Sequence, residues 1–193
     1  MSAADLPLFP LQTVLFPGGR LPLRIFEQRY LEMAKACLRD ATAFGVCLIR
    51  EGGEVGEPAL PEEVGCTARI VEWDMPQLGV LQVVARGERR FRIVNRRVQA
   101  DGLARAEIEL IADADDAPLP ADDLCARVLK RMLDAAPAGL VEKPPRYESS
   151  AWVSGRLAEL LPLSGASKQR LLEMDDAAAR VEILRRLISS SGQ

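Results

Sequence analysis

Four prolines interrupt an apolar segment near the start of the chain, residues 6–26. Proline fixes the backbone angle φ and has no N–H to donate, so within a sheet it is confined to edge strands, strand starts and bulges. The leucine, isoleucine and phenylalanine side chains between the prolines nevertheless require burial. We therefore predict two short extended pieces, Leu6–Leu11 and Leu21–Phe26, joined by a turn at Pro17-Gly18-Gly19.

The apolar spacing becomes helical immediately after this segment. Apolar residues recur every three or four positions from Tyr30 to Leu38, with charged residues between them. This pattern predicts a helix over Glu27–Arg39. An apolar run that ends at a charged, glycine-containing stretch then predicts a buried strand over Ala43–Ile49.

Residues 64–111 carry the pattern of a β-meander, in which consecutive antiparallel strands are joined by short turns. Turns are predicted at residues 75–79, at Gly87-Glu88 and at Asp101-Gly102. In the last strand, apolar residues alternate with charged ones, which indicates one buried face and one solvent-facing side. The four predicted strands are Cys66–Trp73, Val80–Arg86, Arg90–Val98 and Leu103–Ile111.

The final third of the chain has helical periodicity. Ser164 and Asp175 precede two of the periodic segments, and serine and aspartate are favoured N-caps because their side chains accept from free N–H groups. The predicted helices are Ala121–Ala135, Ser150–Leu161, a short helix after Ser164 and a last helix after Asp175. We therefore expect a β-rich subdomain over residues 1–112, an acidic, proline-bearing linker over 113–120 and a helical subdomain over 121–193.

Short motifs along the chain resemble those of the Lon N-terminal domain family, the substrate-recognition domain at the front of Lon-type ATP-dependent proteases. The first three motifs are Leu6–Leu11, Phe16–Gly18 and Pro22–Tyr30. Further motifs are Phe44–Val46, Glu54–Gly56, Val64–Ala68, Gly87–Ile93, Leu160–Leu163 and Lys168–Glu173. The resemblance implies an α+β fold: an N-terminal PUA-like antiparallel β pseudo-barrel with one helix, followed by a C-terminal helical bundle.

Composition excludes several kinds of chemistry. The chain has no histidine, which excludes Ser-His-Asp and Cys-His catalysis. Its scattered cysteines, Cys37, Cys47, Cys66 and Cys125, would have to converge to bind zinc, so we expect buried thiols, no metal and no cofactor. The net charge is −3, no apolar run could cross a bilayer, and no signal-peptide pattern occurs. We expect a soluble, cytoplasmic protein with no membrane contact.

Enzymatic activity is not expected. No glycine-rich phosphate-binding loop of the G-x-x-x-x-G-K-[ST] type occurs. Ser164 and Lys168 are four residues apart, but Ser164 is expected to cap a helix rather than to act as a nucleophile beside Lys168. In the family that the chain resembles, full Lon proteases carry an ATPase module and a Ser-Lys protease module downstream, and this chain ends before either. We therefore expect a stand-alone, non-catalytic protein.

The resemblance implies binding of unfolded polypeptide or of a partner protein, with a protease acting in trans as a further candidate partner. We expect an apolar groove between the β-rich and helical parts. The candidate contact residues are Arg24, Phe26, Arg29, Tyr30, Trp73, Met75 and Leu78. A purely structural alternative stays open for each group: the first four residues can build the core or fasten the helix, and the hairpin tip can pack back onto the fold.

Two other binding functions remain as alternatives. An RNA- or nucleotide-binding PUA-like module would use Arg86, Arg89, Arg90 and Arg92 to contact phosphates. Nucleic acid is the less favoured partner, because only Phe91 is available for base stacking and strand alternation spreads the arginines over both faces. A small-ligand sensor is the other alternative, and it requires a discrete pocket.

Overall fold

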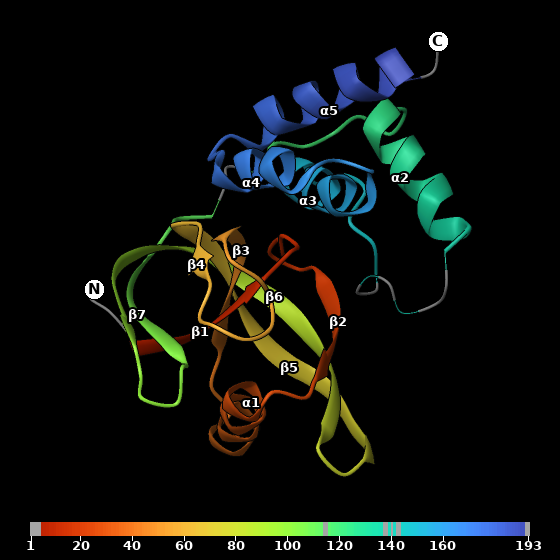
Figure 1. The fold of residues 1–193 in the computed structure, drawn as a ribbon. Coiled ribbons are helices and arrows are strands. Elements are labelled where there is room, and N and C mark those ends of the chain that lie inside the picture. The colour runs from red at the N-terminus through yellow and green to blue at the C-terminus, as the bar shows by residue number, and fades with distance from the viewer. Residues whose placement is uncertain (1–4, 114–115, 137–138, 140, 142–143, 192–193) are drawn as a thin grey trace. The chain divides into compact units, whose positions relative to one another are not determined.

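The computed structural model describes residues 5–113, 116–136, 139, 141 and 144–191. The chain divides into two compact units, Met1–Ile111 (unit 1) and Ala112–Gln193 (unit 2). Figure 1 shows strands and one helix in the first unit and helices in the second. The α+β class and the order of β-rich part before helical part are therefore confirmed.

Unit 1 is a strongly bent sheet that closes on itself. Its strands follow the order β1-β7-β6-β5-β3-β4, and a parallel pairing of β1 with β3 joins the two sides. Strand β2 stands off this path and pairs with β6. The strands are β1 (Asp5–Leu11), β2 (Arg20–Ile25), β3 (Phe44–Glu51), β4 (Leu60–Pro61), β5 (Val64–Gln77), β6 (Val80–Val98) and β7 (Ala104–Leu110).

The turn predicted at Gly87-Glu88 is wrong, because β6 runs through it as one strand. A register shift in the β5–β6 ladder marks the site, and the backbone of Gly87 there exchanges hydrogen bonds with the loop before β2. A Cβ atom added at Gly87 would lie 2.3 Å from the carbonyl oxygen of Phe16. The glycine therefore allows two main-chain segments to approach closely rather than reversing the chain.

The turn between β5 and β6 is tighter than the one predicted over residues 75–79. Strand β5 continues to Gln77, and the chain reverses at Leu78 and Gly79, where Gly79 has a φ of 82°. Glycine adopts this left-handed conformation without the steric cost of a side chain. Strand β2 pairs along this hairpin as far as Leu81, and only the tip of the hairpin extends beyond the neighbouring strands (Figure 1).

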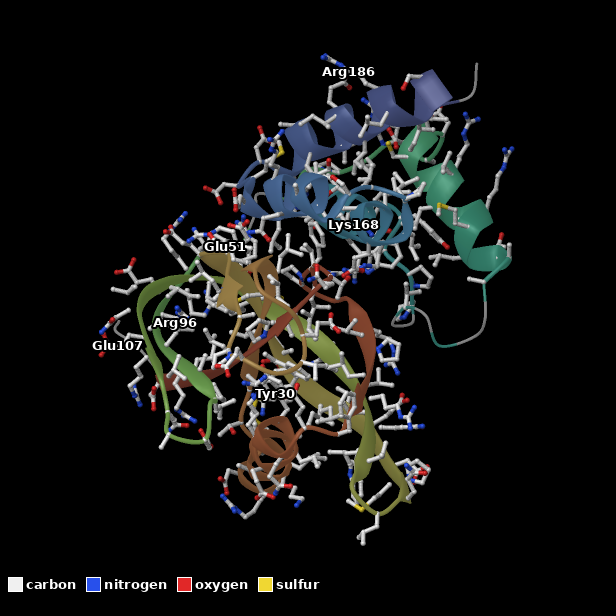
Figure 2. The ribbon with its side chains drawn as sticks, in the orientation of Figure 1. Tyr30, Glu51, Arg96, Glu107, Lys168 and Arg186 are labelled. Atoms are coloured by element: carbon white, nitrogen blue, oxygen red, sulfur yellow. The ribbon has the colours of Figure 1, made fainter. Side chains whose placement is uncertain are left out.

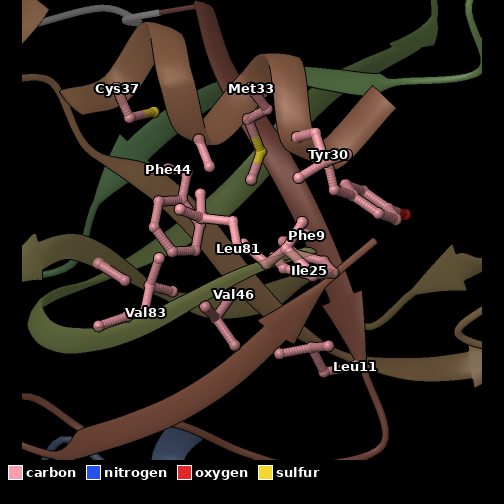
Figure 3. Close-up of a cluster of buried hydrophobic side chains, with 14 of the residues drawn as sticks. Phe9, Leu11, Ile25, Tyr30, Met33, Cys37, Phe44, Val46, Leu81 and Val83 are labelled. Atoms are coloured by element: carbon pink, nitrogen blue, oxygen red, sulfur yellow. The ribbon is translucent and has the colours of Figure 1, made fainter. Parts of the chain in front are cut away.

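The core of unit 1 lies between helix α1 (Gln28–Asp40) and the strands. Tyr30 and Met33 of α1 contact side chains from the sheet, and the ring of Phe9 stacks on that of Tyr30 with centroids 4.2 Å apart (Figure 3). Phe44 and Leu81 are buried in the same cluster. The helix predicted over Glu27–Arg39 is thus present, shifted by one residue, and its apolar side closes the core.

Unit 2 contains four helices among the residues described. They are α2 (Leu124–Asp134), α3 (Ser150–Leu160), α4 (Gly165–Glu173) and α5 (Ala177–Ser191). Ser164 caps α4 as predicted, accepting from the N–H of Ser167, whereas the cap of α5 is Asp176 rather than Asp175. Part of the segment expected as a linker is bonded within unit 2: Asp116 accepts from the N–H of Ala151 at the start of α3.

Candidate functional site

Strand β2 separates two grooves on unit 1. The first, which we call the tyrosine groove, has a volume of about 290 Å³ and is lined by Phe9, Leu21, Leu23, Phe26, Tyr30 and Val55 among others. The second, the tryptophan groove, has a volume of about 480 Å³ and is lined by Pro22, Leu23, Arg24, Trp73, Val83 and Val84 among others. Three residues of β2, Pro22, Leu23 and Arg24, line both grooves.

Sheet register brings the first block of candidate residues next to the hairpin. Arg24 of β2 lies opposite Gln82 of β6, and Gln82 lies opposite Asp74 of β5. Arg24 and Trp73 therefore line one groove although they are far apart in the sequence. Met75 and Leu78 lie further along the hairpin and line neither groove.

Four of the candidate residues are large apolar side chains that remain accessible to solvent. The exposed fraction is 54% for Phe26, 61% for Trp73, 43% for Met75 and 96% for Leu78. Exposed apolar side chains that gather on one part of a surface mark interaction sites more often than isolated ones do. The hairpin tip is thus available to a partner and is not packed back onto the fold.

Arg29 and Tyr30 are buried instead. The Arg29 guanidinium forms an ion pair of 3.0 Å with Glu27, donates to the carbonyl of Gly102 and lies 4.7 Å from the ring centroid of Tyr30. Burial raises the pKa of the Tyr30 hydroxyl. Figure 2 shows Tyr30 between α1 and the strands, where its ring forms part of the tyrosine groove. Arg29 thus fastens α1 to the sheet, whereas Tyr30 both packs the core and lines a groove.

The four arginines of the alternative nucleic-acid surface have different environments. Arg86 lies 3.6 Å from Glu88, which also pairs with Arg69. Arg90 is buried, with 3% of its surface exposed, while Arg89 and Arg92 are exposed. The side chains therefore do not present four free guanidinium groups on one accessible surface.

A third groove, of about 750 Å³, lies beside α1 and is lined by Leu6, Met33, Cys37, Arg89, Arg105 and Ile108 among others. Its acidic side chains are already engaged: Asp5 pairs with Arg97 and Arg105, each at 2.7 Å. Burial raises the pKa of the Cys37 thiol, so the thiol stays protonated at neutral pH. The groove is large, but the groups that line it show no preference for a particular ligand.

The residues named as a Ser-Lys pair have structural roles. The ammonium of Lys168, labelled in Figure 2, donates to the carbonyl of Glu159 at 2.7 Å, and Ser164 caps α4. Burial lowers the pKa of Lys168. Within the described ranges, no three metal-ligating side chains converge, and no helix is long and apolar enough to span a membrane.

Comparison with known proteins places this fold in a family. The family model of the ATP-dependent protease La (LON) substrate-binding domain matches residues 5–190. The chain belongs to the Lon substrate-binding domain family. A Lon N-terminal domain protein from Xanthomonas campestris is 41% identical, with a TM-score of 0.77 over 95% of this chain and 98% of that one. The N-terminal domain of the Mycobacterium avium complex Lon protease, 17% identical with a TM-score of 0.62 over 94% of this chain and 96% of that one, shares the fold.

Full Lon proteases are similar to this Lon-type domain over a small part of their length. The Lon protease of Anaeromyxobacter dehalogenans is 27% identical over 96% of this chain but only 23% of its own. Zebrafish (Danio rerio) cereblon is 29% identical over 65% of this chain and 28% of its own. This chain therefore spans about a quarter of the curated relatives it matches, and it corresponds to the substrate-binding part of a Lon protease.

Sequence reasoning missed one component of the grooves. Val55 is 62% exposed and lines the tyrosine groove, on a loop rich in glycine and glutamate. The main chain of Glu54 and Val55 is held near β1 because the Glu54 carboxylate accepts from the N–H of Gln12. A single apolar residue in a polar loop was the available signal. The edge position of β2 was one of the alternatives that its proline allowed, and the pairing of β2 with β6 alone among the described strands selects it.

Proposed function

We propose that this Lon-type domain is a non-catalytic module that binds polypeptide segments through an apolar surface on unit 1. The surface consists of Phe26, Trp73, Met75 and Leu78, with Arg24 at its margin. The observation that carries the proposal is the exposure of these four large apolar side chains beside two grooves, in a unit that buries most of its other large apolar residues. The groove expected between the two units stays a prediction.

The chemistry of the surface fits partners of varied sequence. Methionine is unbranched and polarizable, so Met75 can adapt to different apolar side chains. Binding is stabilised when a partner covers the apolar surface of a tryptophan or a leucine. A shallow contact of this kind, without a deep pocket, gives weak and broad affinity.

The family adds support for a protein partner. A Lon substrate-binding domain implies contact with protein substrates, and we extend that role to this chain. The partner is an unfolded polypeptide or a partner protein in the cytoplasm, and a protease acting in trans is a candidate recipient of the bound chain.

The test is a titration with a reduced, alkylated protein that cannot refold, followed by fluorescence anisotropy at low and moderate salt. Leu78→Ser removes the most exposed apolar side chain, so we expect affinity to fall by about tenfold if the partner covers it. Val94→Ser is the matched control, since Val94 is 57% exposed in the same unit but lines neither groove. The intrinsic fluorescence change on binding is expected to disappear in Trp73→Phe, because Trp152 is buried.

Two results would contradict the proposal. One is the absence of saturable binding at the highest soluble concentration. The other is equal affinity of Leu78→Ser, Val94→Ser and the unchanged protein, which would place the contact elsewhere. Binding that collapses as salt rises would instead support a phosphate-contacting surface.

A further inference from the structure

Strand β2 leaves one edge of the sheet unpaired. All six of its residues pair with β6, from Arg20 opposite Arg86 to Ile25 opposite Leu81, and it has no second neighbour among the described strands (Figure 1). An edge strand presents a row of N–H and C=O groups that can pair with another extended chain. The free edge of β2 therefore has the chemistry of a site for one more strand.

Register indicates which residues face the free side. The N–H and C=O groups of successive residues in an antiparallel strand point alternately toward one side of the strand and the other. The N–H of Gly87 in β6 donates to the carbonyl of Gly19 at 2.9 Å, so the carbonyl of Gly19 points toward β6. Counting in steps of two from Gly19 assigns Leu21 and Leu23 to the ladder with β6. The main-chain N–H and C=O groups of the alternate residues then point to the free side; these residues are Arg20, Pro22, which has only the C=O, and Arg24. Pro22 supports this assignment, because proline has no N–H and is tolerated where no ladder hydrogen bond is lost.

One of the two grooves lies where the side chains of a strand added to β2 would point. Successive side chains of a strand point to opposite faces. The tryptophan groove is lined by residues of β5 and β6, on the paired side of β2. The tyrosine groove is lined by Phe9, Tyr30 and Val55 among others and by no residue of β5 or β6. Every second side chain of an added strand would therefore enter the tyrosine groove, and the side chains between them would lie on the opposite face.

Charge selects the kind of segment. Arg24 is exposed and forms no ion pair or side-chain hydrogen bond with the residues that the structure describes. Two of the acidic residues that line the grooves are ion-paired, Glu27 with Arg29 and Glu72 with Arg20. Among the described residues, Glu54 and Asp74 accept only from main-chain N–H groups and keep their negative charge. Arg24 is an unpaired cation on the edge strand itself, so a carboxylate on the incoming segment is the complementary group at that position.

We propose that an extended, aliphatic-rich polypeptide segment with an acidic residue adds to the sheet along the free edge of β2. Its main chain pairs with Arg20, Pro22 and Arg24, its aliphatic side chains stand at every second position and enter the tyrosine groove, and its carboxylate faces Arg24. This inference rests on the proposed function, polypeptide binding, and specifies how the segment is held. Main-chain pairing gives affinity for many sequences, and the tyrosine groove and Arg24 supply selectivity.

The first test uses a short labelled peptide in which valine alternates with threonine and one central residue is aspartate. Two further versions carry the same number of N-methyl groups, placed on one or the other alternate set of amides. A strand that pairs along one edge uses only one set, so we expect one version to lose about tenfold in affinity and the other to change by less than about threefold. Fluorescence anisotropy measures all three peptides with the whole chain.

Outcomes of this test separate the two proposals. If the unmodified peptide does not bind while the unfolded protein does, addition along β2 is overturned and polypeptide binding stands. If both methylated versions bind as tightly as the unmodified peptide, or both lose affinity equally, pairing along one edge is likewise overturned. If neither the peptide nor the unfolded protein binds, the proposed function itself fails.

The second test changes the edge of the sheet. Pro22→Val keeps an apolar side chain and adds an N–H on the free side, so we expect peptide affinity to rise several-fold, by one added hydrogen bond. Pro162→Val, at an exposed position in unit 2, is the matched control. Arg24→Gln is expected to weaken the aspartate peptide but not its asparagine counterpart. Unchanged affinity in Pro22→Val, with the variant monomeric and folded, or equal effects of Arg24→Gln on both peptides, would overturn the model.

Discussion

Replacing Gly87 by alanine is expected to destabilise unit 1 although the change is a single methyl group. The added Cβ would lie 2.3 Å from the carbonyl oxygen of Phe16 and 3.1 Å from both Cys66 Sγ and Leu15 Cγ. Relief of the first contact requires the loop before β2 to move away from β6. That movement lengthens two backbone hydrogen bonds, Gly18 N–H to the Gly87 carbonyl at 2.8 Å and Gly87 N–H to the Gly19 carbonyl at 2.9 Å.

The free-energy cost follows from these contacts. Two backbone hydrogen bonds contribute about 0.5–1.5 kcal/mol each, and overpacking a close contact costs about 1–3 kcal/mol. We therefore expect Gly87→Ala to lower the free energy of unfolding by about 2–6 kcal/mol. Since Gly87 does not have a positive φ, the effect is steric and does not arise from a left-handed backbone.

Two other glycines provide controls with different costs. Gly79 has a positive φ of 82°, but a Cβ added there would have no neighbour within 4 Å, so Gly79→Ala is expected to lower the free energy of unfolding by about 1 kcal/mol. At Gly53, the nearest atom to an added Cβ is 3.7 Å away, so the effect is expected to be about zero. Urea unfolding followed by circular dichroism gives the three values, and hydrogen exchange of peptides from β5 and β6 assigns the transition to unit 1. Stability of Gly87→Ala equal to that of Gly53→Ala would refute the steric reasoning.

Three further predictions concern side chains with defined environments. Arg29→Leu is expected to lower the free energy of unfolding by about 2–4 kcal/mol, because it leaves a carboxylate partner unpaired, and to leave the peptide affinity of the folded fraction unchanged; urea unfolding and anisotropy measure the two effects. Asp5 has a pKa below its usual value because Arg97 and Arg105 donate to its carboxylate. The stabilisation is therefore present above the unfolded pKa, near 4, and is lost as pH falls through the folded pKa. Asp5→Asn should remove this part of the acid dependence of Tm, and an identical fall of Tm with decreasing pH in both proteins would contradict the prediction. Burial raises the pKa of Cys47 to about 12, and all four cysteines are buried. An aromatic disulfide that reacts with free thiols is therefore expected to label none of them at pH 8 in the folded protein and all of them in urea.

Local patterns in the sequence predicted most elements of unit 1. Proline positions predicted the strands at Leu6–Leu11 and Leu21–Phe26, and helical spacing predicted the helix that follows. These signals are local: each depends on the conformational limits or apolar period of neighbouring residues. Gly87 misled the prediction because a glycine required for close approach and a glycine required for a turn look the same in a sequence.

Pairings between distant segments were not available from the sequence. The parallel pairing of β1 with β3 closes the sheet, and it brings Leu8 opposite Gly45. Partner choice depends on which distant apolar faces meet, and no local pattern contains this information. The same limit applied to the arginines of β6, whose burial differs between Arg90 and Arg92 although they share a strand.

The sequence by itself determined the family, the order of elements and the absence of histidine-based chemistry, because motifs, periodicity and composition do not depend on tertiary contacts. Only the tertiary structure decided where the candidate residues lie. It buried Arg29 on the inner side of α1 and left Trp73 and Leu78 exposed on the hairpin. It also placed β2 at a free edge between two grooves. Exposure depends on what packs against a side chain, and that is fixed by contacts between segments far apart in the chain.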